Sequence, residues 1–187
     1  MAEIKLILLD FDGTLVDTRD ANAYAYIKTL SEVGIDISKE EYLEKYFGVR
    51  CMEFLRMVGV ADSAEIDRLR RRKVELYPNY FDNVRLNTAL WQWCKMMRSM
   101  GAKVWIVSTG YIDNIRNVMR YLMLDNEVDD IISGDDVSRP KPYPDCFIRA
   151  MQIEGVSPEE TIIFEDSNVG IAAAKSSGAA YVRITDF

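Results

Sequence analysis

The chain has 187 residues, of which 49% are hydrophobic and 28% charged, and its formal net charge is −7. This length suffices for one sizeable core with room for an inserted segment. The negative charge argues against nucleic acid or an anionic membrane as the main partner, and no run of about 18 apolar residues predicts a spanning helix. Three widely spaced cysteines and a start without signal-peptide character favour a reduced protein of the cytoplasm.

Histidine is absent from the sequence. This excludes Ser-His-Asp triads, Cys-His dyads and histidine-rich metal sites. Acid–base chemistry would have to use carboxylates, lysine, tyrosine or cysteine, and a bound metal would lie among oxygen ligands. Oxygen ligands favour Mg²⁺ over Zn²⁺.

The first predicted elements are a strand and a long helical block. Residues 4–9 form an apolar run that ends in acids and a glycine, which is typical of a strand buried on both faces of a parallel sheet. Hydrophobic residues then recur at helical spacing up to Gly34, where the helix should end. Capping-box patterns at 38–41 and 62–65 predict two further helices, with a loop at 47–51 between them.

Strands and helices alternate in the second half of the chain. We predict strands at 103–110, 128–132, 161–166 and 181–184, and helices at 114–124, 145–153 and 168–177, after a helix with the stripe Leu90, Trp93, Cys94 and Met97. This alternation predicts βαβ units and a parallel sheet. We therefore expect an α/β fold, a three-layer Rossmann-like core of residues 1–15 and 86–187, with residues 16–85 inserted as an α-helical cap.

Polar residues follow three of the predicted strands, in the segments DFDGT, STG and EDS that begin at Asp10, Ser108 and Glu165. Ligands bind beyond the carboxyl ends of parallel strands, so these segments would share one crevice if their strands are neighbours. The crevice would hold four carboxylates: Asp10, Asp12, Glu165 and Asp166. A divalent cation such as Mg²⁺ would offset their repulsion and could bind a phosphate. One acid could then act as a nucleophile and a second could carry protons.

The same segments resemble the motifs of the haloacid dehalogenase superfamily. The resemblance is to the branch with a helical cap after the first strand, which holds β-phosphoglucomutase-like and phosphoglycolate-phosphatase-like enzymes. DFDGTLVDT matches the first motif, Ser108 in VWIVSTG the second, Lys141 in RPKPYPDCF the third, and FEDSNVGIAAAKSSGA (164–179) the fourth. The four motifs stand in the family's order, and the resemblance covers essentially the whole chain.

The resemblance implies roles for the carboxylates. Asp10 would be the nucleophile that becomes phosphorylated, and it would also lie at the metal. Asp12 would be the general acid/base, and its backbone carbonyl would bind the metal as well. Asp166 would ligate Mg²⁺ directly, and Glu165 would support the ion directly or through water. The dehalogenase branch lacks the second aspartate, so Asp12 favours phosphoryl transfer.

The resemblance also implies groups that bind the phosphate and the rest of the substrate. Ser108 would bind the phosphoryl oxygens, with Thr109 and Gly110 beside it, and Lys141 would steady the nucleophile and the phosphate. In the cap and the segment leading into it, the residues expected to contact substrate are Thr18, Asn22 and Arg50.

The expected activity is that of a monomeric, Mg²⁺-dependent phosphatase acting on a small phosphorylated metabolite. One alternative is a phosphomutase of a sugar phosphate, although hexose-phosphate mutases of this branch place a histidine near the position of Asn22. A second alternative is a non-catalytic binding protein on this fold. Two other charged groups are predicted to be structural. The acids Asp135 and Asp136 would lie in a loop, and RLRRRK (68–73) would form the solvent face of a helix.

Overall fold

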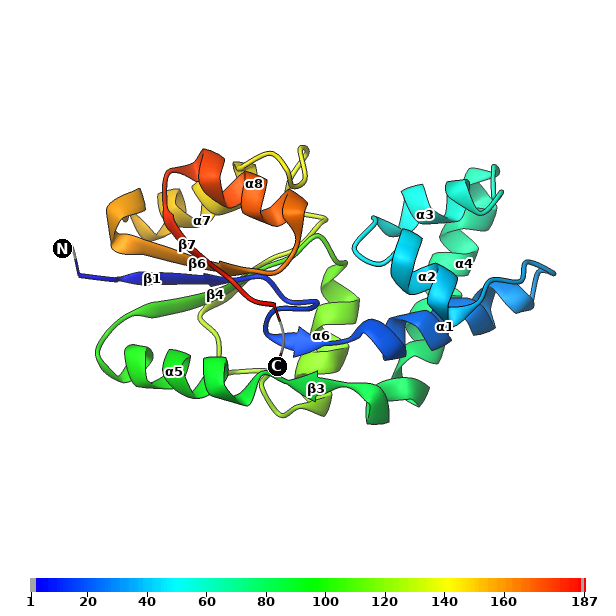
Figure 1. The fold of residues 1–187 in the computed structure, drawn as a ribbon, viewed down its shortest axis with the longest axis horizontal. Coiled ribbons are helices and arrows are strands. Elements are labelled where there is room, and N and C mark those ends of the chain that lie inside the picture. Colours follow the sequence, from blue (N-terminus) through cyan, green and yellow to red (C-terminus); the bar gives the residue numbers. More distant parts are fainter. Residues whose placement is uncertain (1–2, 186) are drawn as a thin grey trace. The chain divides into compact units, whose positions relative to one another are not determined.

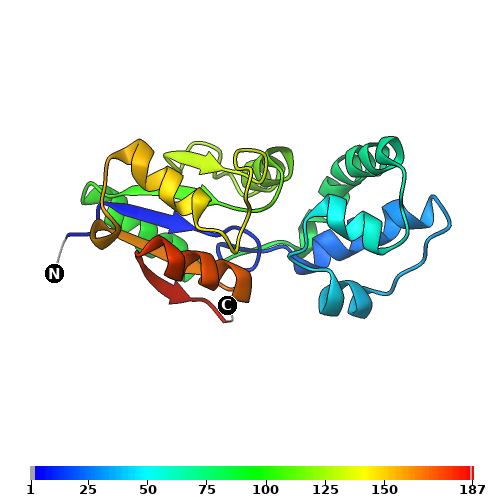
Figure 2. The same cartoon turned by 90° about the horizontal axis from the view of Figure 1, so that it is seen from above.

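The computed structural model describes residues 3–185 and 187 (Figures 1 and 2). The chain divides into two compact units, which we call the α/β unit (Met1–Asp17 with Leu86–Phe187) and the helical unit (Thr18–Arg85). The boundary between the first segment of the α/β unit and the helical unit lies after residue 17, whereas the sequence predicts it after residue 15. The helical block does not start at Val16. Instead, β2 (Val16–Asp17) pairs with β3 (Arg85–Leu86) in a two-stranded sheet.

A five-stranded parallel sheet forms the centre of the α/β unit. Its strands are β1 (Leu6–Leu9), β4 (Lys103–Val107), β5 (Asp130–Ile132), β6 (Thr161–Glu165) and β7 (Ala180–Arg183). The strand order is β5-β4-β1-β6-β7, so β1 lies between β4 and β6. Every side chain of β1 is fully buried, as expected of a central strand covered on both faces.

Helices cover both faces of this sheet (Figure 1). The helices on one face are α7 (Asp145–Glu154) and α8 (Asn168–Ser177), and those on the other are α5 (Thr88–Ser99) and α6 (Ile112–Tyr121). The main buried cluster lies between the sheet and α7 and α8, and it includes Leu8, Trp105, Phe147 and Ile163. The three layers and the parallel sheet confirm the predicted fold class.

One detail of the α/β unit and one of the helical unit differ from the sequence-based expectation. In α5 the buried side chains are Leu90, Trp91 and Cys94, whereas Trp93 is half-buried and its ring centroid lies 5.2 Å from that of Phe164. In the helical unit, α3 (Cys51–Met57) begins inside the stretch predicted as a loop. Its N-cap residue makes no side-chain capping hydrogen bond, so the sequence carries no capping signal there.

The helical unit has an aromatic core of its own. Its elements are α1 (Arg19–Ser31), α2 (Lys39–Lys45), α3, α4 (Ser63–Leu76) and the 3₁₀-helix η1 (Tyr77–Asn83). The Phe54 ring lies at the centre of this core, with centroids 4.8 Å from Tyr26, 5.5 Å from Tyr42 and 5.0 Å from Tyr46. The two predicted capping positions are confirmed, because Ser38 and Asp62 accept hydrogen bonds from backbone N–H groups in the first turns of α2 and α4.

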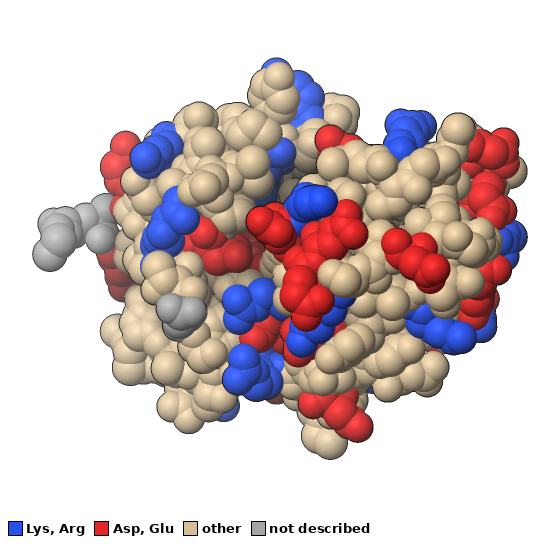
Figure 3. Space-filling view, turned by 45° about the vertical axis from the view of Figure 1, so that its right-hand side comes forward, with Lys and Arg blue, Asp and Glu red and all other residues tan. Residues whose placement is uncertain are grey.

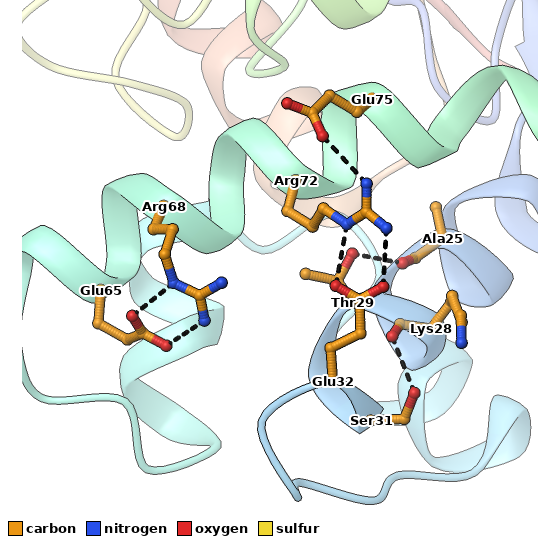
Figure 4. A network of polar contacts seen from close by, with 9 residues as sticks. All are labelled: Ala25, Lys28, Thr29, Ser31, Glu32, Glu65, Arg68, Arg72 and Glu75. Carbon is orange, nitrogen blue, oxygen red and sulfur yellow. Dashed lines mark hydrogen bonds and ion pairs between the residues drawn. The ribbon is translucent and has the colours of Figure 1, made fainter.

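Ion pairs on the surface of α4 connect it to the end of α1 (Figure 4). The Arg72 guanidinium donates two hydrogen bonds of 2.9 Å to Glu32 and one of 3.1 Å to Glu75. Arg68 pairs with Glu65 within α4 at 2.6 Å. Exposed ion pairs of this kind each contribute about 0–1 kcal/mol, so the aromatic core carries most of the unit's stability.

Lys73 corrects the prediction that RLRRRK is a solvent-facing run. This lysine is only 2% exposed. Its Nζ lies 3.5 Å from the centroid of the Tyr77 ring and donates a 2.7 Å hydrogen bond to Asn22 Oδ1. The ring face and the amide oxygen both stabilise a buried ammonium.

Acidic and basic side chains are intermixed over the face of the molecule that Figure 3 draws. Both signs of charge therefore stand close together there despite the net charge of −7. In the described part of the chain, no helix has the length and apolar character that crossing a membrane requires.

Candidate active site

The polar segments after β1, β4 and β6 meet at one edge of the sheet, because these three strands are neighbours. Asp10 directly follows β1, and its backbone N–H donates to the Phe164 carbonyl at 2.9 Å. Ser108 directly follows β4, and Glu165 is the last residue of β6. The condition that the sequence left open, that these strands lie side by side, is met.

Lys141 is the centre of the site. Its Nζ donates hydrogen bonds of 2.7 Å to Asp10 Oδ1, 2.7 Å to Glu165 Oε1 and 3.0 Å to the Val107 carbonyl. The lysine side chain is 2% exposed and that of Glu165 is 1% exposed. A lysine in the turn before α7 therefore provides the counter-charge for two buried carboxylates, an arrangement that holds all three side chains in fixed orientations.

Glu165 is fixed at both of its oxygens. While Oε1 binds Lys141, Oε2 accepts hydrogen bonds from the backbone N–H of Ser167 at 2.8 Å and from its hydroxyl at 3.0 Å. Gly170 in α8 makes room for this carboxylate, since a Cβ at that position would lie 1.6 Å from Oε1. The glycine and the serine, which the sequence did not single out, allow the first turn of α8 to pack directly on Glu165.

Asp166 is positioned by residues of the first motif. The Thr14 hydroxyl donates to Asp166 Oδ1 at 3.2 Å. A Cβ on Gly13 would lie 2.3 Å from Asp166 Oδ2, and Gly13 has φ of +93°, so glycine is needed both for space and for conformation. Thr14 was not predicted as a site residue, and its only signal is a hydroxyl directly after Asp12-Gly13.

Asp12 lies beside the loop that follows β4. The backbone N–H of Gly110 donates to Ser108 Oγ at 3.0 Å. A Cβ at Gly110 would lie 3.3 Å from Ser108 Oγ and 3.4 Å from Asp12 Oδ2, so the serine hydroxyl and this carboxylate share one small space. Thr109 is half-buried in the same loop.

The electrostatics of the site leave the acids short of positive charge. Burial raises the pKa of Asp10 well above its ordinary value, and the neighbouring Glu165 and Asp166 add to this rise against the opposing effect of Lys141. Burial followed by the charge of Glu165 also raises the pKa of Asp166. Burial would lower the pKa of Lys141, but Asp10 and Glu165 outweigh it and keep the lysine charged. One ammonium thus faces three carboxyl groups.

The residues present fit a divalent cation. Asp10, Glu165 and Asp166 can each offer a carboxylate oxygen, and these oxygens lie within 4.8 Å of one another. A set of carboxylate oxygens suits a hard cation such as Mg²⁺. Because Lys141 and Ser167 already occupy both oxygens of Glu165, Asp10 and Asp166 are the more available for direct contact with an ion.

The remaining predicted substrate contacts lie outside the α/β unit. Thr18, Asn22 and Arg50 belong to the helical unit. Within that unit, Asn22 Nδ2 donates to Thr18 Oγ1 at 3.1 Å, and Asn22 Oδ1 accepts from Lys73. Arg50 stands at the N-cap position of α3. Their contact with substrate stays a prediction.

The acids Asp135 and Asp136 bind groups of their own loop and of α6. The Asp136 carboxylate accepts from the backbone N–H and the hydroxyl of Ser133 at 2.8 and 2.7 Å. Asp135 accepts from the backbone N–H of Ile112 at 3.3 Å. These contacts agree with the predicted loop role.

The chain is similar to several proteins of known name. The chain is 28% identical over 180 residues to phosphoglycolate phosphatase of Aquifex aeolicus. The matched region covers 94% of this chain and 82% of the relative. It is 27% identical over 185 residues to 6-phosphogluconate phosphatase of Escherichia coli, covering 95% and 81%. The crystal structure of CbbY from Rhodobacter sphaeroides in complex with phosphate matches with a TM-score of 0.87 at 26% identity, over 98% of this chain and 87% of that one.

The family model of the haloacid dehalogenase-like hydrolases matches residues 7–184. This range contains the first motif with Asp10 and Asp12, the buried Lys141, and the acids Glu165 and Asp166. The chain belongs to the haloacid dehalogenase-like hydrolase family.

Proposed function

We propose that this phosphatase hydrolyses a small phosphorylated metabolite through an aspartyl-phosphate on Asp10, with Mg²⁺ as the bound cation. The observation that carries the proposal is the geometry around Asp10. Lys141 orients its carboxylate at 2.7 Å, inside a buried cluster with two further acids that can hold a cation. Relatives that match the chain over most of its length are named as phosphatases, which supports the same reading.

In the first half of the reaction, a carboxylate oxygen of Asp10 attacks the phosphorus atom. The bond between phosphorus and the ester oxygen breaks as the bond to Asp10 forms, and Asp12 donates a proton to the leaving oxygen. In the second half, a water molecule attacks the phosphorus of the aspartyl-phosphate and gives its proton to Asp12. The bond to Asp10 breaks, and inorganic phosphate leaves.

Ser108 and Lys141 act on the phosphoryl group in different ways. The Ser108 hydroxyl, which lies beside Asp12, can donate directly to a phosphoryl oxygen. Lys141 carries three N–H donors, and all three already have acceptors in Asp10, Glu165 and Val107. The lysine therefore acts through its charge and through the orientation of Asp10. A bound cation supplies the further positive charge that the carboxylates and the phosphate need.

We assign the helical unit to the role of a cap that closes over the substrate, limits access of bulk water and selects the substrate. Its position in the chain, after the first motif, supports this role. Thr18, Asn22 and Arg50 are the residues we expect to contact the part of the substrate beyond the phosphate. Two of the relatives are named for phosphorylated sugar acids or small phosphorylated acids, so sugar phosphates and phosphorylated acids are the substrates to test first.

The three cysteines support the cytoplasm as the working compartment. Cys51, Cys94 and Cys146 are all buried free thiols. Burial raises the pKa of the Cys94 thiol to about 12, so it remains protonated and unreactive.

We propose that the enzyme acts in the cytoplasm as a monomer on a small-molecule phosphate ester.

The test is phosphate release from a panel of phosphorylated sugars and acids, with Mg²⁺ and with a chelator. Wild type and Asp10→Asn are compared, and Asp135→Asn serves as the matched control because Asp135 lies in the same unit outside the cluster. We expect metal-dependent release that Asp10→Asn abolishes and Asp135→Asn retains. The proposal would be overturned if Asp10→Asn still released phosphate, or if folded wild type released phosphate from no compound in the panel. Isomerisation of sugar phosphates would then be assayed.

A further inference from the structure

Arg183, the last residue of β7, reaches back to the acidic loop that follows β6. Its guanidinium donates from one nitrogen to the backbone carbonyl of Asp166 at 3.0 Å and from another to Asn168 Oδ1 at 3.0 Å. The parallel register places Arg183 opposite Glu165, and the backbone N–H of Ile184 donates to the Glu165 carbonyl at 2.8 Å. The arginine thus bridges the end of β6 and the start of α8.

The loop that Arg183 bridges is very short. Only Asp166 and Ser167 connect β6 to α8, and Ser167 is committed to capping the helix through the backbone N–H of Gly170 at 3.0 Å. The Asp166 side chain is held from the first motif by Thr14. Its backbone is held by Arg183, from the other side of β6. The direction of the Asp166 carboxylate therefore depends on two other segments of the chain, the first motif and β7.

We propose that Arg183 is a positioning residue, which orients Asp166 for the cation of the active site. This inference rests on the proposed cation site. The planar guanidinium binds two acceptors at once and so fixes the angle of the loop, which a lysine ammonium cannot reproduce. The positive charge of Arg183 opposes cation binding, but the side chain is exposed and water screens it, so the geometric effect dominates.

The test compares Arg183→Lys, which keeps the charge, with Arg183→Met, which removes it. Mg²⁺ affinity of the full chain is measured by titration calorimetry without substrate. We expect both variants to bind Mg²⁺ about three- to tenfold more weakly than wild type, which is below the loss for a buried partner of a metal ligand because Arg183 is exposed. Both should fold, and their thermal midpoints without metal provide the check.

Arg149 supplies the matched control. It is also an exposed arginine of the α/β unit that donates to the backbone carbonyl of an aspartate, Asp136, outside the acidic cluster. Arg149→Lys and Arg149→Met should bind Mg²⁺ like wild type. Wild-type affinity in Arg183→Lys, whatever Arg183→Met does, would overturn the positioning role, as would an equal loss in the Arg149 variants. If wild type itself does not bind Mg²⁺, the proposed cation site fails, and this inference fails with it.

Discussion

At the scale of single residues, Lys141 determines whether the acidic cluster is stable. Asp10 and Glu165 are buried beside it, and neither carboxylate is exposed enough for water to replace the ammonium. A buried ion pair adds little stability compared with apolar packing, but removal of one partner leaves an uncompensated charge. The buried ion pairs thus hold the nucleophile in one orientation and contribute less to stability than apolar packing would.

Replacement of Lys141 by methionine should lower the free energy of unfolding by about 3–5 kcal/mol at pH 7, because two buried carboxylates lose their counter-charge. Urea unfolding in the presence of a chelator measures this change. Phosphate release should disappear as well, since Asp10 loses its orienting donor. The same substitution in an Asp10→Asn background should cost less, because one of the two carboxylates is then neutral. Equal costs in both backgrounds would show that the lysine does not act through Asp10.

For Gly170, helix propensity and packing predict opposite effects of a substitution by alanine. Glycine inside a helix is about 1 kcal/mol less favourable than alanine, so propensity alone predicts that Gly170→Ala stabilises the protein. The Cβ would instead lie 1.6 Å from Glu165 Oε1, which must move away from Lys141. We expect a loss of about 3 kcal/mol in unfolding free energy and of phosphatase activity.

Gly34→Ala is the comparison for this substitution. A Cβ at Gly34 meets no atom within 4 Å, and only its φ of +74° opposes the change. A cost of about 1 kcal/mol with full activity is expected there. If Gly170→Ala proved as mild as Gly34→Ala, the close packing of α8 on Glu165 would not be the constraint we infer.

At the scale of elements, Asp129 joins α5, β4 and the start of β5. It accepts hydrogen bonds from Arg98 and Lys103, at 3.1 Å each, and from the backbone N–H of Val104 at 2.9 Å. Burial alone would raise the pKa of this carboxyl, but the donors together hold it below its ordinary value. A lowered native pKa means that the ionised group stabilises the fold.

Asp129→Asn should therefore lower stability near neutral pH by about 1–2 kcal/mol. The stabilisation by the ionised group is complete above the unfolded-state pKa of about 3.9 and is lost as the pH falls through the lower native value. The unfolding free energies of wild type and variant should converge in that acidic range, which urea titrations at several pH values would show. A difference that stays constant down to pH 3 would mean that charge is not its cause.

The elements and the central acids could be predicted from sequence because their signals are local. Asp10, Ser108 and Lys141 stand in motifs that are legible in a few residues each. The contacts of Arg183 and Gly170 depend on the register of β7 against β6 and on the packing of α8. Tertiary structure brings these residues together, and no local sequence pattern links them. The burial of Lys73 follows from a different signal than the charge of RLRRRK: its helical spacing from Leu69 and Leu76 places it on the buried face.

At the scale of the whole molecule, the two units have separate cores. The helical unit packs around Phe54, and the α/β unit packs around its sheet. All three tryptophans, Trp91, Trp93 and Trp105, belong to the α/β unit. Tryptophan fluorescence therefore reports the unfolding of one unit alone, whereas far-ultraviolet circular dichroism reports helices of both.

We expect the two units to unfold in separable steps, because each buries its own apolar core and could in principle fold alone. Mg²⁺ at 100 times its dissociation constant should stabilise the α/β unit by about 2.7 kcal/mol and shift the fluorescence transition in urea. Arg72→Met, which removes the tie between α4 and Glu32, should lower only the helical step, by at most about 1 kcal/mol. A single transition, coincident by both probes and moved equally by Mg²⁺ and by Arg72→Met, would instead show that the units unfold as one cooperative body, so that binding at the acidic cluster stabilises the helical unit as well.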